Sequence, residues 1–308
     1  MITTITFNPS IDKHYILDDL IKGEVTRAKK VQNTAGGKGL NVSRVIRLLG
    51  ESVTATGFLG GNSGGFIVDK LSELKINNRF IKVKGETRSC LAIITKDLAQ
   101  TEILEPGPTI QEDEMAEWVK AYDEILEDSS IICASGSLPR GLSVSTYGEI
   151  IKKANIKGAK FLLDTSGEAL KKGIESKPYF IKPNIDELKA ITGESINSDN
   201  DVLKIIDKIH DKGIKLVMVS LGANGSIAGF NGKKYRIYVP KIKAVNPVGS
   251  GDSMVAGIAV ALERGYNIED VLAFASATGT ANAMEQQTGY VNINNVNKVK
   301  EEIRIELI

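Results

Sequence analysis

A carboxylate follows two closely spaced glycines at the start of a long segment of small residues. Within Asn246–Ser253, Pro247 ends any strand, and two glycines then lead into a helical pattern. At the start of this helix four backbone amides can converge on an anion, those of Gly249, Ser250, Gly251 and Asp252. The carboxylate of Asp252 lies beside them in the first turn, where it can accept a proton from a hydroxyl that attacks phosphorus. Helix capping by Asp252 is the structural alternative, but capping requires neither the glycines nor the apolar helix behind them.

A second glycine-rich stretch surrounds a lysine near the amino end of the chain. Three glycines flank Lys38 directly before a helical pattern, namely Gly36, Gly37 and Gly39. Glycine lets the backbone approach a ligand closely, and the start of a helix favours anions and polar oxygens. Asn41 can both donate and accept hydrogen bonds, as a sugar diol requires. The same residues fit a tight turn before a helix, so this stretch alone leaves both interpretations open.

Composition restricts the classes of function that the chain can carry. The 308 residues are 42% hydrophobic and 25% charged, and 39 Lys and Arg against 38 Asp and Glu give a net charge of +1. These values indicate globular structure with a sizeable core, and they argue against a disordered chain or a nucleic-acid binder. The cysteines and histidines are Cys90, Cys133, His14 and His210. They are too few for a disulfide framework or a His-rich metal site. Without a signal peptide or a membrane-spanning apolar run, we expect a reduced, cytoplasmic protein with no membrane partner.

Short β-branched runs alternate with segments of helical periodicity. We predict strands at Ile2–Phe7, Val53–Phe58, Leu91–Thr95, Ile131–Ala134, Lys160–Asp164, Tyr179–Lys182 and Leu216–Ser220. We predict helices at Leu40–Leu49, Ile67–Leu74, Gln111–Glu127, Ser145–Ala154 and Val202–His210, and a helical pattern from Asn246 to the end. The alternation indicates right-handed βαβ units and a mostly parallel sheet covered on both faces. In such sheets ligands bind beyond the carboxyl ends of the strands, where we expect both glycine-rich motifs.

Two stretches interrupt this alternation. Asp12–Val31 is polar with few helical signals, and residues 80–105 have the pattern of short strands around a Gly-Glu-Thr-Arg sequence that ends at Arg88. Together they predict a small sheet that projects from the main domain. We expect this lid to comprise about residues 12–32 and 82–106.

The two glycine-rich motifs resemble the paired signatures of the ribokinase-like carbohydrate kinases, the phosphofructokinase B family. Gly36–Ser43, with Gly50 and Gly60 at the expected spacing, resembles the first signature, and Asn246–Ala259 resembles the second. The resemblance covers the whole chain and implies a single ribokinase-like kinase domain over residues 1–308. The implied fold is α/β, with a Rossmann-type, mostly parallel sheet flanked by helices and a small β-sheet lid. The implied activity is ATP-dependent phosphorylation of a hydroxymethyl group, with ATP and Mg²⁺ bound.

Further residues match the nucleotide side of that family. Asn184 and Glu187 resemble its Asn-x-x-Glu motif, in which the glutamate acts through water on Mg²⁺ and the phosphates. Three positions apart, the two side chains share one face of a helix, although the start of a surface helix has the same pattern. The resemblance also implies ATP contacts at Lys182, Ser220, Gly222, Gly225 and, in the adenine pocket, Asn282.

Residues on the lid side indicate a phosphorylated acceptor. The resemblance implies that Asp12 holds acceptor hydroxyls and that Ser137 lies on the substrate side. Because arginine binds phosphate through two parallel hydrogen bonds, we expect Arg88 to hold a sugar phosphate, with Lys38 and Arg27 completing the clamp. Surface salt bridges are the alternative for both arginines. We also expect acceptor contacts at Gly36, Gly37 and Asn41.

These motifs look like the branch that contains tagatose-6-phosphate kinase and 1-phosphofructokinase. Ser10, Asn246–Ser250 and Gln287–Asn292 favour the former, and Asp164–Leu170 favours the latter. A ketohexofuranose carries a CH₂O group at both ends, so one base and one clamp can phosphorylate C1 of a 6-phosphate or C6 of a 1-phosphate. We expect D-tagatose 6-phosphate to be converted to the 1,6-bisphosphate, with fructose 1-phosphate as the alternative acceptor. The resemblance also implies a homodimer formed through the lid, whose exposed strand edges and apolar residues need cover.

Three other functions have weaker support. A non-catalytic sugar-phosphate sensor would be favoured by loss of Asp252 or Asp12, and both are present. A nucleoside kinase binds an uncharged acceptor and would have little use for Arg88. Gly61–Gly65 matches the serine-hydrolase elbow, but a triad also needs a histidine, and His210 lies in a charged helix pattern.

Overall fold

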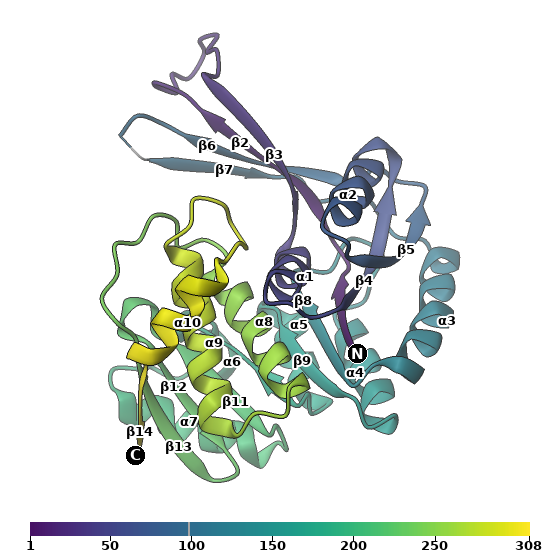
Figure 1. Cartoon of the computed structure of the whole chain (residues 1–308). Helices are drawn as coiled ribbons and strands as arrows, with labels where there is room; N and C mark the ends of the chain where they lie inside the picture. The colour runs from purple at the N-terminus through teal and green to yellow at the C-terminus, as the bar shows by residue number, and fades with distance from the viewer. Residues whose placement is uncertain (98) are drawn as a thin grey trace.

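The computed structural model describes residues 1–97 and 99–308, and a ten-stranded sheet forms its centre (Figure 1). The strand order is β14-β13-β12-β11-β10-β9-β8-β1-β4-β5. The strands from β11 to β5 in this order run parallel, which confirms the mostly parallel sheet predicted from the sequence. They are β1 (Ile2–Thr6), β4 (Val53–Gly60), β5 (Asn77–Val83), β8 (Ile131–Ser135), β9 (Lys160–Asp164), β10 (Phe180–Ile181) and β11 (Leu216–Ser220).

Helices cover both faces of this sheet, which explains why its parallel strands are nearly continuous runs of buried residues. One face packs against α1 (Lys38–Leu48), α2 (Gly61–Glu73), α8 (Ser250–Glu263), α9 (Ile268–Ala283) and α10 (Ile293–Glu302). The other packs against α3 (Glu112–Asp128), α4 (Thr146–Ile156), α5 (Gly167–Glu175), α6 (Ile185–Thr192) and α7 (Asp199–Asp211). Side chains of β1 alternate between the two cores, with Ile2 in the first and Ile5 in the second. None of the helices in the described ranges has both the length and the apolar character needed to cross a bilayer.

Three antiparallel strands extend the sheet beyond β11. They are β12 (Ser226–Phe230), β13 (Lys233–Tyr238) and β14 (Arg304–Leu307). The prediction that the chain is helical from Asn246 to the end is therefore wrong for its last residues. Arg304–Leu307 forms backbone hydrogen bonds with Tyr235–Tyr238 instead. Four residues are too few to give a strand pattern that can be recognised against the preceding helix.

A four-stranded sheet projects from the main domain as a lid (Figure 1). Its order is β3-β2-β6-β7, from β2 (Ser10–Ile16), β3 (Lys30–Gly36), β6 (Arg88–Ile94) and β7 (Gln100–Leu104). Strand β2 runs antiparallel to β3 and parallel to β6, so the sheet is mixed. Ser10 pairs with Gly36 on one side and with Arg88 on the other. The root of the lid thus joins the first glycine-rich motif to the Gly-Glu-Thr-Arg turn.

Helix α2 begins at Gly61, well before the predicted start at Ile67. Its first residues have the composition of a turn, because glycine weakens a helix. The carboxylate of Glu86 accepts hydrogen bonds from the amides of Asn62 and Ser63 at 3.2 and 2.7 Å. This tertiary cap satisfies amides that would otherwise lack acceptors, and it allows the helix to extend through the glycines.

The contact between α8 and α9 requires a glycine. A Cβ atom on Gly257 would lie 2.7 Å from the Cα atom of Ala275, and the backbone there cannot move aside easily. We predict that Gly257→Ala lowers the free energy of unfolding by about 1–3 kcal/mol, the usual cost of overpacking.

Gly65→Ala is the matched control, because it makes the same substitution inside α2. A Cβ atom at Gly65 would meet nothing within 4 Å. Alanine in a helix is about 0.5–1 kcal/mol more favourable than glycine, so this variant should be neutral or stabilised. Urea unfolding measures both variants, and equal effects on the two would contradict the packing argument.

Candidate active site

The two glycine-rich motifs meet where helices α1 and α8 begin. The side-chain amide of Asn41 donates a 2.9 Å hydrogen bond from Nδ2 to Oδ2 of Asp252, although the two residues are 211 positions apart. Both helices begin beside the carboxyl ends of parallel strands, as expected. A Cβ atom on Gly39 would overlap the Thr6 side chain at the end of β1, and one on Gly251 would lie 3.0 Å from Nζ of Lys182, which follows β10.

Asp164, the last residue of β9, lies between two lysines. Its Oδ2 is 3.8 Å from Nζ of Lys38, and its Oδ1 is 3.8 Å from Nζ of Lys182. Asp164, Lys182 and Asp252 are all buried. Oδ2 of Asp164 accepts no hydrogen bond within the described residues. Buried polar atoms are normally satisfied, so this oxygen is suited to a ligand or a metal-bound water.

Burial raises the pKa of Asp252 to about 6, and the nearby Asp164 carboxylate acts in the same direction. Lys38, the Asn41 hydrogen bond and Lys182 oppose this rise. A carboxyl with this pKa is ionised near neutral pH and is more basic than an ordinary aspartate. These are the properties that a general base requires.

Gly249 sets the backbone that leads into α8. Its φ of 82° is left-handed, and a Cβ atom there would lie 2.7 Å from the amide nitrogen of Gly289. The amides of Gly251 and Asp252 belong to the first turn of α8, which provides no intrahelical acceptor for them. With Lys182 close to Gly251, these amides form a suitable site for a phosphate group.

The nucleotide-side residues follow β10 and β11. Asn184 and Glu187 form a reciprocal capping box at the start of α6: Oδ1 of Asn184 accepts from the Glu187 amide at 2.8 Å, and Oε2 of Glu187 accepts from the Asn184 amide at 2.9 Å. Ser220 ends β11 and bridges to Asn184. The turn after it contains two glycines with positive φ, Gly222 at 59° and Gly225 at 82°. The structure thus brings these residues to one edge, and Oε1 of Glu187 is not used by the cap.

Asn282 has a structural role in this arrangement. The side chain is fully buried, and its Nδ2 donates to the carbonyl of Val248 at 2.9 Å and to Ser250 Oγ at 3.3 Å. Its Oδ1 accepts from Ser253 Oγ and from the amide of Tyr290. A direct nucleotide contact would require this network to open.

Asp12 lies at the root of the lid against Gly36. A Cβ atom on Gly36 would overlap the Asp12 carboxyl group, so only glycine fits there. Ser10 donates to Oδ1 of Asp12 at 2.6 Å. Burial raises the pKa of Asp12, while the Ser10 hydrogen bond and the nearby Arg44 oppose that rise.

Arg88 and Ser137 are connected through Asn8. Arg88 donates to the carbonyl oxygen of Asn8 through Nε at 3.3 Å and Nη2 at 3.0 Å, and to that of Glu105 through Nη1 at 3.0 Å. Nδ2 of Asn8 donates to Ser137 Oγ at 3.4 Å. The guanidinium is thus tied to the backbone at the base of the lid.

Within one chain, Arg27 lies far from Arg88 and Ser137. It is exposed in the connection between β2 and β3, beyond the pairing of Ile16 with Lys30. Arg88 pairs with Ser10 at the other end of β2, and the length of that strand separates the two ends by about 20 Å. Lys38 lies beside Asp164 rather than beside Arg88.

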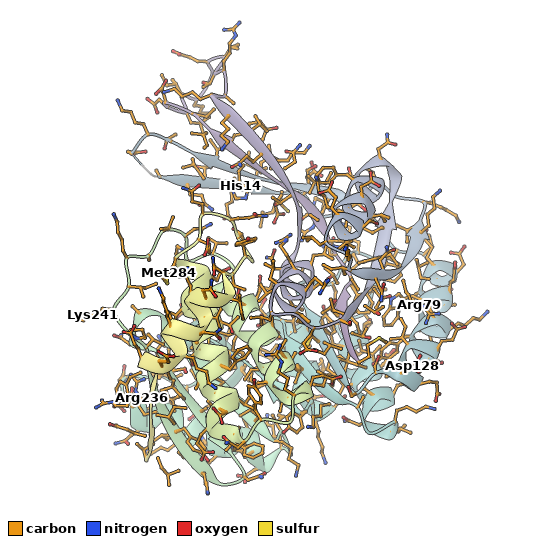
Figure 2. The ribbon with its side chains drawn as sticks, in the orientation of Figure 1. His14, Arg79, Asp128, Arg236, Lys241 and Met284 are labelled. Carbon is orange, nitrogen blue, oxygen red and sulfur yellow. The ribbon has the colours of Figure 1, made fainter. Side chains whose placement is uncertain are left out.

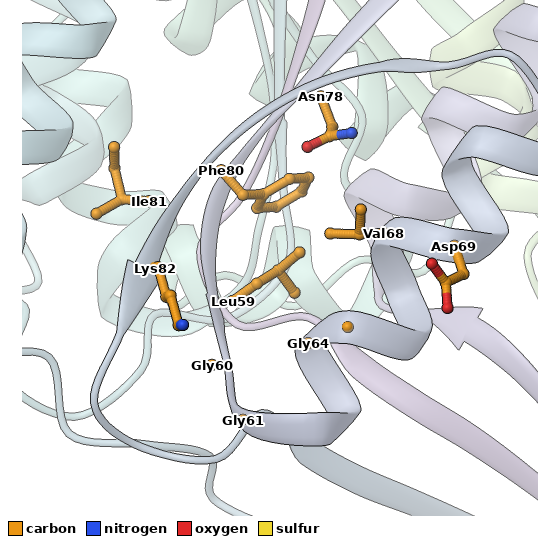
Figure 3. A pocket seen from close by; sticks show the side chains of 11 residues that line it. Leu59, Gly60, Gly61, Gly64, Val68, Asp69, Asn78, Phe80, Ile81 and Lys82 are labelled. Carbon is orange, nitrogen blue, oxygen red and sulfur yellow. The ribbon is translucent and has the colours of Figure 1, made fainter.

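Other candidate sites are separate from this cluster. A cavity of about 320 Å³ lies between α2 and β5, lined by residues that include Leu59, Val68 and Phe80 (Figure 3). The serine-hydrolase elbow at Gly61–Gly65 does not assemble a triad in the described parts of the chain. His14 lies on the lid (Figure 2), and Nδ1 of His210, on α7, bonds to the backbone carbonyl of Ile214.

The model of the pfkB family carbohydrate kinases matches residues 3–294. The chain belongs to the pfkB family of carbohydrate kinases. The resemblance drawn from the two signatures and the ribokinase-like α/β fold are both confirmed.

Solved structures similar to this carbohydrate kinase cover its full length. Phosphofructokinase-2 from Escherichia coli, in complex with potassium, is 30% identical, with a TM-score of 0.93 over 98% of both chains. A Staphylococcus aureus protein provisionally assigned as a phosphofructokinase is 36% identical, with a TM-score of 0.87 over 100% of this chain and 99% of that chain. A Thermotoga maritima protein provisionally assigned as a 1-phosphofructokinase is 26% identical, with a TM-score of 0.90 over 100% and 99%.

Two charged residues of the candidate site, Asp164 and Arg44, were assigned no role from the sequence. Asp164 is the end of a predicted parallel strand, and that position is itself a signal, because ligands bind at the carboxyl ends of such strands. Arg44 is one helical turn after Asn41 and is buried. A cation on the buried face of a predicted helix is the corresponding signal.

We predict that Asp252→Asn is more stable than the wild-type kinase above pH 6. Aspartate in an unfolded chain titrates near 3.9, whereas folded Asp252 titrates at about 6, so the folded state binds this proton more tightly. The stability that the neutral carboxyl contributes is therefore full below about pH 4 and is lost as the pH rises through 6. Asparagine titrates at neither pH, so the Tm difference, variant minus wild type, should increase from pH 4 to pH 7.

Thermal unfolding across this pH range tests the prediction. Asp128→Asn, at the exposed end of α3 (Figure 2), is the control and should give no comparable trend. A Tm difference for Asp252→Asn that does not change with pH would show that the Asp252 carboxyl carries no such shift.

Proposed function

We propose that this kinase transfers the γ-phosphoryl group of ATP to D-tagatose 6-phosphate, giving D-tagatose 1,6-bisphosphate. The observation that carries the proposal is the position of the Asp252 carboxylate. It lies in the first turn of α8, accepts a hydrogen bond from Asn41 of the first motif, and shares a charged cluster with buried Asp164 and Lys182 and with the more exposed Lys38. A base placed between two glycine-rich helix starts is suited to activate a hydroxyl beside a phosphate site.

Asp252 removes the proton from the acceptor hydroxyl. Asn41 occupies Oδ2, so Oδ1 is the oxygen that receives the proton. The acceptor oxygen forms a bond to the γ-phosphorus as the bond from that phosphorus to the β-phosphate oxygen breaks. The amides of Gly249, Gly251 and Asp252 stabilise the charge on the group in transfer. The Ser250 amide donates to the Pro247 carbonyl at 3.2 Å and would have to leave it to join them.

The nucleotide-side residues fit ATP and Mg²⁺. When bound, ATP supplies the phosphoryl group and Mg²⁺ neutralises charge on its phosphates. Lys182 would hold the phosphates, and Glu187 would act on the metal through water, for which its free Oε1 and the unpartnered Oδ2 of Asp164 are available. The remaining nucleotide contacts would come from Asn184, Ser220, Gly222, Gly225 and Asn282.

The acceptor would be held at the root of the lid. Asp12 would accept hydrogen bonds from sugar hydroxyls, and Arg88 would turn from its backbone acceptors to the sugar phosphate. The 6-phosphate is supported by a relative: phosphofructokinase-2 from Escherichia coli, 28% identical in this comparison, with a TM-score of 0.89 over 98% of each chain, has a structure in complex with fructose-6-phosphate. Tagatose and fructose 6-phosphates differ only in configuration at C4.

The second candidate activity is that of a 1-phosphofructokinase. The Thermotoga maritima neighbour and the Asp164–Leu170 sequence favour it. In this case fructose 1-phosphate would bind with its ring reversed and accept the phosphoryl group at C6, while Asp252 and Arg88 would keep the same roles.

A coupled ADP-release assay distinguishes the acceptors. With ATP and Mg²⁺, tagatose 6-phosphate, fructose 1-phosphate and fructose 6-phosphate are compared by kcat/KM, and we expect tagatose 6-phosphate to give the highest value. A higher kcat/KM with fructose 1-phosphate or fructose 6-phosphate would overturn tagatose 6-phosphate as the proposed acceptor.

The control is Asp252→Asn, whose kcat should fall by a factor of about 10²–10⁴ while it still binds ATP, because a general base typically contributes that factor. Near-normal turnover by Asp252→Asn would refute the assignment of the base.

The lid supports a homodimer. Strand register places Tyr15, Val31, Leu91, Ile93 and Ile103 on the face of the lid opposite to Asp12. Ile103 is 53% exposed and lies on the edge strand β7. An apolar face that ends in an open strand edge is stabilised when a second copy covers it.

Ile103→Lys should therefore give monomers in light scattering at concentrations where the wild type is dimeric. Leu104→Lys is the matched control, because its side chain is 61% exposed on the same strand but points to the opposite face. Dissociation by both substitutions, or by neither, would contradict a dimer formed through this face.

A further inference from the structure

Arg44 is a buried cation whose guanidinium is hydrogen-bonded to no carboxylate in the described ranges. It lies on α1 and is 6% exposed; burial lowers its pKa, and the carboxylates of Asp12 and Asp252 oppose this from a distance, without an ion pair. Among the described residues, its guanidinium donates to neutral oxygens. Nη1 donates to Oδ1 of Asn41 at 3.0 Å and to the carbonyls of Thr288 and Gly289 at 3.0 and 3.4 Å, and Nη2 donates to the carbonyl of Ala35. Burial of an unpaired charge is costly, so such a residue requires an explanation beyond packing.

The hydrogen bond from Arg44 determines which way the Asn41 amide points. Arginine has five N–H donors and no acceptor, so only the oxygen of Asn41 can lie against it. The NH₂ group of Asn41 must then point to the other side, where it donates to Oδ2 of Asp252. The orientation of this amide therefore follows from the chemistry of its two neighbours.

Besides Asn41, the same guanidinium contacts two further parts of the site. Ala35 lies in β3, so the Arg44 hydrogen bond to its carbonyl reaches the root of the lid. Thr288 and Gly289 form the loop that packs against Gly249, where a Cβ atom would come within 2.7 Å of the Gly289 amide. Arg44 thus contacts the lid, the residue that holds the carboxylate, and the support of the phosphate-binding turn.

We propose that Arg44 is a positioning residue for phosphoryl transfer: it locks the Asn41 amide so that Asn41 donates to Asp252 and keeps that carboxylate ionised and oriented. The inference rests on the proposed function in one respect, since it takes Asp252 as the base.

The loss of Arg44 would change the pKa of Asp252 against a background of other charges. Asp164 at the end of β9 opposes ionisation of Asp252, and Lys38 on α1 and Lys182 after β10 favour it. On the lid side, Asp12 of β2 acts on Arg44. Without Arg44, the Asn41 amide can turn its oxygen toward Asp252, and the carboxyl group must then be protonated to donate a hydrogen bond. The pKa of Asp252 should therefore rise further above 6.

Arg44→Met tests the inference. It keeps an unbranched apolar stem and removes every donor. We expect the acid limb of the pH profile of kcat/KM, and the ¹³C carboxyl titration of Asp252 by NMR, to move up by about one pH unit, the size of a lost hydrogen bond to a charged group. The Asp252 signal is assigned by its absence in Asp252→Asn. Arg47→Met is the matched control, since Arg47 lies on the same helix and donates to the carbonyl of Leu74, away from Asp252.

A double variant tests whether Arg44 acts on Asp252 through the Asn41 amide, which we call the relay, or directly through its own charge. In Asn41→Ala, addition of Arg44→Met should cause no further shift. An equal shift in both backgrounds would overturn the relay, as would an unchanged Asp252 titration in a folded Arg44→Met protein. Thermal unfolding and ATP binding show whether Arg44→Met is folded. If it is not, Arg44→Lys and Arg44→Gln are used in its place. Lysine can still donate to the Asn41 oxygen and should shift the titration less than glutamine.

The NMR titration uses the protein without any acceptor, so the two proposals fail independently. A wild-type protein that phosphorylates none of the three sugars would refute the proposed function, even where Arg44→Met shifts the Asp252 titration. Conversely, an active enzyme whose Asp252 titrates identically in wild type and Arg44→Met would refute only the role of Arg44.

Discussion

The hydrogen bond between Asn41 and Asp252 connects two segments that lie far apart in the sequence. Helix α1 follows β3 of the lid, and α8 follows β13 of the antiparallel edge. Their first turns can meet only because the parallel strands between them bring both helices to one face and one edge. The sheet, the helix packing and the glycines that allow close approach all serve this contact. Displacement of either helix start would separate the carboxylate from the residue that orients it.

Charge balance around Asp252 keeps the pKa of this buried carboxyl between that of an ordinary aspartate and neutral pH. Asp164 and burial favour its neutral form, while Lys38, Lys182 and the amide of Asn41 favour the anion. The competing influences leave a group that is more basic than aspartate in water but still ionised at neutral pH. Such a balance costs stability, as expected at catalytic sites, where strained electrostatics are retained because function requires them.

The sequence allowed the parallel core to be predicted, together with the position of both glycine-rich motifs at the carboxyl ends of its strands, because long β-branched runs and paired glycine motifs are strong local signals. It did not allow the antiparallel edge to be predicted, although Asn231-Gly232 between β12 and β13 is a hairpin signal, and both residues adopt positive φ. The third strand of that edge, β14, depends on pairing across about 70 residues, which no local pattern carries. Likewise, the capping box of Asn184 and Glu187 satisfies both the structural and the functional interpretation of one motif, so the sequence alone could not separate them.

The position of β1 in the interior of the sheet, between β8 and β4, has a consequence for biosynthesis. The first strand to leave the ribosome must wait for β4 and then β8 before either of its edges is covered. Helix α8, which carries Asp252 and is buried along most of its length, begins after more than four-fifths of the chain has been synthesised. The glycine-rich turn that leads into α8 therefore forms only on a nearly complete scaffold. A nascent chain that ends before α8 presents the loops after β10 and β11 without Asp252.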